Sequence, residues 1–135
     1  MIKIENVSKA FREKIVLSKI SFTANEGEVT ALIGPNGSGK STLLKILLGL
    51  ISTDEGRATF DGKNYGELGK YPFRYVGTFL DSFQPNPTRT AYNHLRWIAL
   101  TSGISKQRCL ECLKIVGLQD VGNKKRSEER RVGKE

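Results

Sequence analysis

The chain has 135 residues, of which 38% are hydrophobic and 27% charged, a composition typical of one soluble globular domain rather than a disordered segment. No run approaches the roughly 18 apolar residues of a membrane-spanning helix, and no apolar segment follows the N-terminus as in a signal peptide, so we expect a cytoplasmic protein. The formal net charge of +8 comes mostly from dispersed residues, so we expect no nucleic-acid partner.

Three strand patterns come first in the chain. Ile2 and Ile4 alternate with polar residues, which predicts a strand at the edge of a sheet. Residues 19–24 alternate in the same way and predict a half-buried strand, which a turn at residues 25–27 ends. Residues 29–33 are mostly apolar and rich in β-branched side chains, which predicts a short strand buried on both faces.

A glycine-rich loop follows, and it matches the pattern G-x-x-x-x-G-K-[ST] at every fixed position. Glycines let backbone N–H groups close around a phosphate, and the helix after such a loop offers its N-terminus to the same anion. The lysine can reach the β- and γ-phosphates, the serine hydroxyl can bind Mg²⁺, and the next hydroxyl lies near the α-phosphate. A glycine-rich turn that matches by chance is the alternative, but a strand before the loop and a helix after it favour phosphate binding. The candidate residues are Gly34, Pro35, Asn36, Gly37, Ser38, Gly39, Lys40, Ser41 and Thr42.

The segment after the loop predicts a helix at about residues 40–50. This helix is apolar nearly all round, so we expect it to be buried in a core. Residues 57–60 then predict a strand, which ends in a hairpin-turn signal at Asp61-Gly62. Residues 75–80 predict a further strand.

The rest of the chain predicts helices. Pro85 and Pro87 mark a loop, after which residues 88–101 and 105–116 predict two helices separated by Gly103. The order of elements predicts an α/β core with a flanking β layer and an incomplete helical segment.

Two cysteines in the second of these helices have C-x-x-C spacing. A zinc site needs about four ligands, whereas Cys109 and Cys112 are accompanied in the sequence by one histidine, His94. Positions i and i+3 of a helix share one face, so we interpret the pair as helix packing rather than as a metal or redox site. We expect a structural or solvated role for His94.

The sequence around the loop resembles the ATP-binding cassette (ABC) family in particular. The stretch IGPNGSGKSTLL, residues 33–44, is close to the family's usual sequence, and residues 7–11 followed by Val16-Leu17 resemble its opening strands. Residues 53–62 and 76–81 continue a resemblance that covers about residues 1–121. It implies an α/β fold of the P-loop NTPase class: a truncated ABC-type nucleotide-binding domain with a flanking antiparallel β layer and a partial helical subdomain.

The resemblance also assigns roles to two residues outside the loop. Phe11 stands where the family places an aromatic side chain that stacks on adenine, the alternative being an ordinary core aromatic. Asp81 stands where most members carry the Q-loop glutamine, which contacts Mg²⁺ and couples to the membrane partner; the alternative is a surface carboxylate. An acidic residue at this position, together with residues 85–95, resembles bacterial exporter branches of the family.

For function, the resemblance implies ATP and Mg²⁺ as ligands, a dimer with a second nucleotide-binding domain, and docking on a transmembrane permease subunit. The protein would lie at the inner face of the cell membrane and energise export by ATP binding and hydrolysis. Two alternatives are a soluble ABC ATPase acting in translation or DNA repair, and a nucleotide-binding fragment without cellular activity.

Some parts of the family pattern are missing from the sequence. The Walker B acids, the signature motif and the switch histidine do not follow the loop, so no catalytic residue is assigned and we expect ATP binding without hydrolysis. We expect residues 1–125 to be the N-terminal part of a nucleotide-binding domain. Residues 126–135 back-translate to AGATCGGAAGAGCGTCGTGTAGGGAAAGAG, which looks like a widely used DNA-sequencing adapter. We therefore expect a non-native tail on a truncated reading frame, the alternative being a charged, solvated helix end.

Overall fold

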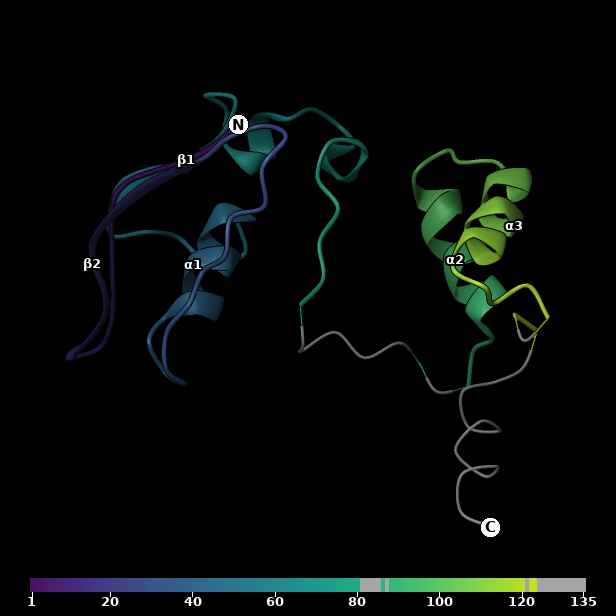
Figure 1. The fold of residues 1–135 in the computed structure, drawn as a ribbon, viewed down its shortest axis with the longest axis horizontal. Coiled ribbons are helices and arrows are strands. Elements are labelled where there is room, and N and C mark those ends of the chain that lie inside the picture. The colour runs from purple at the N-terminus through teal and green to yellow at the C-terminus, as the bar shows by residue number, and fades with distance from the viewer. Residues whose placement is uncertain (81–85, 87, 121, 124–135) are drawn as a thin grey trace, which may run out of the picture. The chain divides into compact units, whose positions relative to one another are not determined.

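The computed structural model describes residues 1–80, 86, 88–120 and 122–123. The chain divides into two compact units, Met1–Thr78 and Phe79–Glu135, which we describe separately (Figure 1). The predictions for Asp81, for Pro85 and Pro87, and for residues 126–135 lie outside the described residues.

A three-stranded antiparallel sheet forms most of the first unit. β1 (Ile2–Phe11) pairs on one side with β2 (Lys14–Ala24) and on the other with β3 (Glu55–Phe60). The half-buried alternation predicted for residues 19–24 is confirmed. The predicted edge position of the first strand is wrong, because β1 is the central strand. A period of two residues indicates that one face is buried, but it does not indicate how many edges are paired.

The helix α1 (Lys40–Leu47) packs on the sheet and supplies the rest of this unit's buried core. Leu43, Ile46 and Leu47 lie at helical spacing and are buried in one cluster with five residues of the sheet: Ile4, Val7, Leu17, Ala58 and Phe60. The burial predicted nearly all round the helix is confirmed in part, since Leu44 is exposed. The helix ends at Leu47 rather than at about residue 50, because Gly49 adopts a left-handed φ of 68° that stops the helical path.

Two of the predicted strands do not form. In the described part of the chain, residues 29–33 and 75–80 pair with no strand. Val29 is fully exposed and Ile33 is 90% exposed, so the prediction of a strand buried on both faces is wrong for this structure. A buried strand needs a hydrogen-bonded neighbour on each edge, and the described residues supply none for either segment.

The turn after β3 has the predicted hairpin geometry. Asp61 and Gly62 have φ values of 47° and 80°, and Phe60 and Lys63 exchange backbone hydrogen bonds of 2.8 and 3.0 Å across them. Two short 3-10 helices follow, η1 (Tyr65–Glu67) and η2 (Pro72–Arg74).

Two helices form the second unit, as the sequence predicts. The Thr90 hydroxyl caps α2 (Ala91–Thr101) and the Ser105 hydroxyl caps α3 (Lys106–Ile115), each accepting a backbone N–H of the first turn. The two helices pack together, with Ala99 of α2 and Leu113 of α3 buried. Among the described residues, no helix combines the length and the apolar character that crossing a membrane requires.

Candidate phosphate-binding site

The glycine-rich loop leads directly into the first turn of α1. A turn begins at Pro35, whose carbonyl oxygen accepts the Ser38 N–H at 3.2 Å. Gly39, the N-cap residue, has a φ of 90°, a conformation that residues with a side chain rarely adopt. Within the described residues no side chain caps this helix start. The N–H groups of the first turn therefore keep their capacity to bind an anion.

Gly39 also fixes the loop against the sheet. It is buried, and a Cβ atom on it would lie 2.7 Å from Leu17 Cδ2 and 2.8 Å from the Val16 carbonyl oxygen of β2. Both distances are shorter than those of real Cβ contacts. Glycine is therefore needed at this position because the loop lies so close to β2, as well as because of its φ angle. The loop is thus held on β2 by close backbone contact.

The Lys40 ammonium lies within the curve of the loop. Lys40 Nζ donates to the Gly34 carbonyl oxygen at 2.5 Å, to the Pro35 carbonyl oxygen at 2.7 Å and to Ser38 Oγ at 3.2 Å. All three acceptors are uncharged, and an ammonium forms stronger hydrogen bonds with anionic oxygen. Ser41 is exposed and Thr42 half-buried in the helical turn that follows. The loop therefore places a cation, two hydroxyls and a helix N-terminus within a few residues.

Phe11 lies near this loop along the β1–β2 hairpin. The ladder pairs Lys9 with Leu17, the residue that Gly39 contacts, and Phe11 is two residues farther along β1, roughly 7 Å. In Figure 1 the hairpin turn and the start of α1 lie toward the same end of the first unit. Phe11 is 45% exposed and lies outside the buried core cluster. Its ring is therefore accessible at the end of the sheet that carries the loop.

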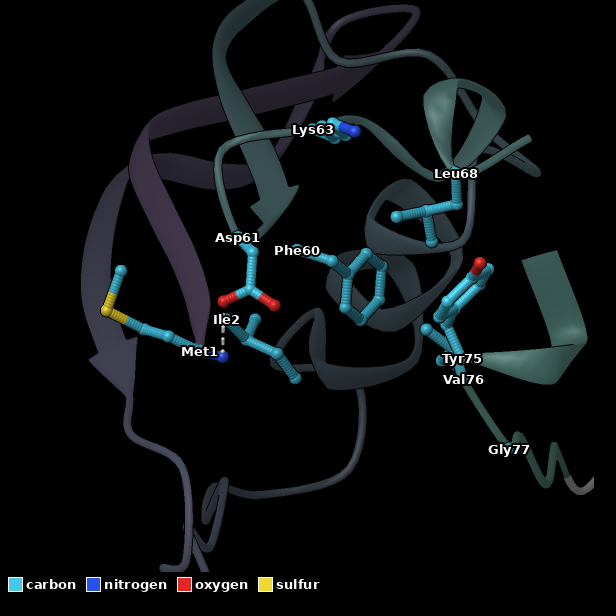
Figure 2. Close-up of a pocket in the computed structure, with 9 residues that line it drawn as sticks. All are labelled: Met1, Ile2, Phe60, Asp61, Lys63, Leu68, Tyr75, Val76 and Gly77. Atoms are coloured by element: carbon cyan, nitrogen blue, oxygen red, sulfur yellow. Dashed lines mark hydrogen bonds and ion pairs between the residues drawn. The ribbon is translucent and has the colours of Figure 1, made fainter.

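A separate cavity of about 710 Å³ lies at the opposite end of β1. Figure 2 shows Phe60 and Tyr75 among its walls, and it shows the Met1 amino group paired with Asp61 at 2.8 Å. None of the residues lining the cavity belongs to the phosphate loop. A phosphate loop binds through backbone N–H groups at the surface, so the candidate site is the loop and not this cavity.

The other candidate residues lie on the two helices of the second unit. Cys109 is buried, with its Sγ 3.6 Å from the Ser105 carbonyl oxygen, and Cys112 is half-buried. Both are free thiols on α3, which confirms the predicted helical placement. His94 is half-buried on α2. Among the described residues no three metal-ligating side chains gather into a group.

Sequence reasoning missed two charged residues beside Phe11. The Lys9 ammonium lies 5.5 Å from the centre of the Phe11 ring, and it is paired with the Asp54 carboxylate at 2.6 Å. Lys9 could have been found, because residues two apart on a strand share one face. Asp54 could not, because the sequence does not reveal how the turn before β3 meets β1.

The sheet, the glycine loop and the helix that follows it define a P-loop nucleotide-binding protein. Residues 17–133 match the family model described as ABC transporter, and the chain belongs to this family. The lantibiotic transport ATP-binding protein SrtF of Streptococcus pyogenes is 33% identical over 121 residues, which cover 90% of this chain and 52% of SrtF. The linearmycin resistance ATP-binding protein LnrL of Bacillus subtilis is 35% identical over 124 residues, 89% of this chain and 40% of LnrL.

A solved structure shows the same fold. This chain is 29% identical in sequence to an ATP-binding cassette whose dimeric structure was solved in a post-hydrolysis state bound to ADP and Pi, and the two folds match with a TM-score of 0.72. The match covers 93% of this chain and 61% of that one. The predicted family and fold class are confirmed. The chain spans about half the length or less of the two curated relatives named above.

Proposed function

We propose that residues 34–42 bind the phosphate groups of ATP or ADP together with Mg²⁺. The observation that carries this proposal is the position of the Lys40 ammonium, which three loop acceptors hold at the start of α1. A cation, a helix N-terminus and a backbone without side chains form a site for a polyanion. Phosphate oxygens can replace the uncharged loop acceptors, because a charge-assisted hydrogen bond is the stronger one.

We assign the base to Phe11 and the metal to Ser41 and Asp81. Phe11 would take the adenine ring, which its exposure and its place on the hairpin support. The Ser41 hydroxyl and the Asp81 carboxylate would hold Mg²⁺, which prefers oxygen ligands. Exposure of Ser41 in the first turn of α1 supports its role, and the family resemblance supports that of Asp81.

For the whole protein, we propose an ATP-binding transporter subunit that energises export through a permease. Two nucleotide-binding domains would dimerise, and the pair would lie at the inner face of the membrane through the permease. The names of SrtF and LnrL refer to lantibiotic transport and linearmycin resistance, which supports transport over the alternative of a soluble ABC ATPase in translation or DNA repair. The related cassette bound to ADP and Pi supports nucleotide binding and dimerisation.

Calorimetric titration of the full chain with Mg–ATP tests the loop. Lys40→Ala should lower the affinity by about 10- to 100-fold, because a hydrogen bond between charged partners contributes roughly 1.5–3 kcal/mol. Lys45→Ala is the matched control: it removes the same charge from the last turn of the same helix and should leave the affinity unchanged. Equal binding of Mg–ATP by the wild type and Lys40→Ala would contradict the proposal.

A further inference from the structure

Lys9 is held between a carboxylate and an aromatic ring. Its side chain is only 11% exposed, although lysine is one of the residues most often exposed in proteins. Lys9 Nζ donates to Asp54 Oδ1 at 2.6 Å and lies 5.5 Å from the centre of the Phe11 ring. The ammonium is therefore fixed over the ring rather than moving freely in solvent.

Asp54 owes its own position to β1. Its second carboxylate oxygen accepts the Ala10 N–H at 2.7 Å, and its own N–H donates to the Ser8 carbonyl oxygen at 3.0 Å. The neighbouring Thr53 hydroxyl donates to the same Ser8 oxygen at 3.0 Å. These contacts continue the β1–β3 pairing beyond its last pair, Ser8 and Glu55. Asp54 thus links the turn before β3 to the end of β1 that carries Phe11.

We infer that Asp54 is a positioning residue for the nucleotide base: it holds Lys9 over one face of Phe11 and so presents the other face to adenine. This inference rests on the proposed role of Phe11. An ammonium over one ring face attracts the π electrons toward itself, which makes the opposite face a better partner for an electron-rich purine. A ring fixed in advance also loses less conformational entropy when the base binds.

A comparison of two ligands distinguishes a role of Asp54 in base binding from a general effect on the phosphate loop. Mg–ATP carries the base and the phosphates, whereas inorganic tripolyphosphate with Mg²⁺ carries the phosphates alone. Loss of the Lys9–Phe11 contact should weaken ATP binding and leave tripolyphosphate binding unchanged. A merely structural role for Asp54 would disturb the seating of the loop on β2 and would weaken both ligands together.

The experiment measures both affinities for the full chain with Asp54→Asn and with Lys9→Met, which keeps the apolar stem of lysine without its charge. We expect each variant to bind ATP at least about two- to fivefold more weakly, because that is the range for an exposed cation–π contact and the Lys9 side chain is only 11% exposed. Phe11→Ala should lose at least as much ATP affinity. Glu5→Gln is the matched control: it removes another ion-paired carboxylate, which lies in β1 and is bound to Lys3 and Arg57, and it should change neither affinity.

The possible results distinguish a failure of this inference from a failure of the proposed function. Equal losses for ATP and tripolyphosphate, or no loss of ATP binding in Asp54→Asn and Lys9→Met, would overturn the inference while leaving phosphate binding intact. An unchanged ATP affinity in Phe11→Ala would also overturn the inference, because it would mean that the adenine base does not stack on Phe11. A wild-type chain that binds neither ligand would overturn the proposed function itself and this inference with it. If Asp54→Asn unfolds, Lys9→Met still decides, because it leaves the contacts of Asp54 with Ser8 and Ala10 in place.

Discussion

Two carboxylates, Glu5 in β1 and Asp54 just before β3, bind protons less readily than usual. Hydrogen bonds from Lys3 and then Arg57 hold the pKa of Glu5 below its ordinary value of 4.5. A hydrogen bond from Lys9 and then the Ala10 N–H hold the pKa of Asp54 below its ordinary value of 3.8. Both groups are therefore more acidic in the folded chain than in the unfolded one, which links their ion pairs to pH.

Stability should consequently fall in acid. A carboxylate whose pKa is lowered by folding stabilises the fold above its unfolded pKa, and this contribution disappears as the pH falls through the folded pKa. We expect the melting temperature to fall once the pH drops below about 5, and to keep falling through the folded pKa values, which lie below 4.5 for Glu5 and below 3.8 for Asp54. The double variant Glu5→Gln with Asp54→Asn should show a shallower drop in thermal melts followed by circular dichroism. Equal slopes for both proteins would show that these pairs contribute nothing to acid sensitivity.

The contact between the phosphate loop and β2 joins two elements of the fold and does not depend on one side chain alone. Gly37 and Gly39 both have left-handed φ values, 82° and 90°, but a Cβ on Gly37 would meet no atom within 4 Å. Gly37→Ala should therefore cost only the conformational strain, about 1–2 kcal/mol. Gly39→Ala adds a clash with Val16 and Leu17, which should cost about 1–3 kcal/mol more.

Thermal or urea unfolding without nucleotide measures this difference. Because no ligand is present, the comparison reports how the loop rests on the strand and not how it binds phosphate. Equal losses of stability in Gly37→Ala and Gly39→Ala would mean that the loop can shift away from β2 at no cost.

The elements that the sequence predicts well are those with a local cause. The helices of the second unit begin after Thr90 and Ser105, whose hydroxyls cap them, and the hairpin turn at Asp61-Gly62 follows from residues that accept a positive φ. Residues 29–33 and 75–80 have strand-like composition but no paired strand in the described part of the chain, and composition alone does not supply a partner.

The candidate site likewise has one part that the sequence predicts and one part that it does not. The residues of the loop are consecutive, so one motif finds Gly34 to Thr42 together with the helix that they start. The seating of Gly39 on β2 and the chain of contacts from Asp54 through Lys9 to Phe11 join segments that are distant in sequence. Such contacts depend on strand register, which shifts in the β1–β2 pairing between Ile4 and Val7 and again farther along.

For the molecule as a whole, the exposed segment of residues 29–33 predicts self-association. It combines apolar side chains with backbone groups that no strand pairs within the described residues, which is how sheet edges recruit another chain. Val29→Lys should raise the monomer fraction several-fold, since a charge opposes edge-to-edge pairing. The control Leu50→Lys changes a residue that is 62% exposed and lies outside this segment, and it should have a smaller effect.

Sedimentation velocity over a range of protein concentrations separates these variants. The expected result is a mass that rises with concentration for the wild type and Leu50→Lys, and that rises much less for Val29→Lys. A wild-type chain that sediments as a monomer throughout would show that residues 29–33 recruit no second copy.

The three hydrogen bonds of Lys40 give the phosphate loop an internal competitor. Carbonyl oxygens of Gly34 and Pro35 and the Ser38 hydroxyl already occupy the donors that a nucleotide would need. Binding is then an exchange reaction, in which the heat released is the difference between the bonds gained and the bonds given up. The affinity of the loop consequently depends on the strength of its own resting bonds, and a change that weakens them would tighten nucleotide binding without touching the ligand.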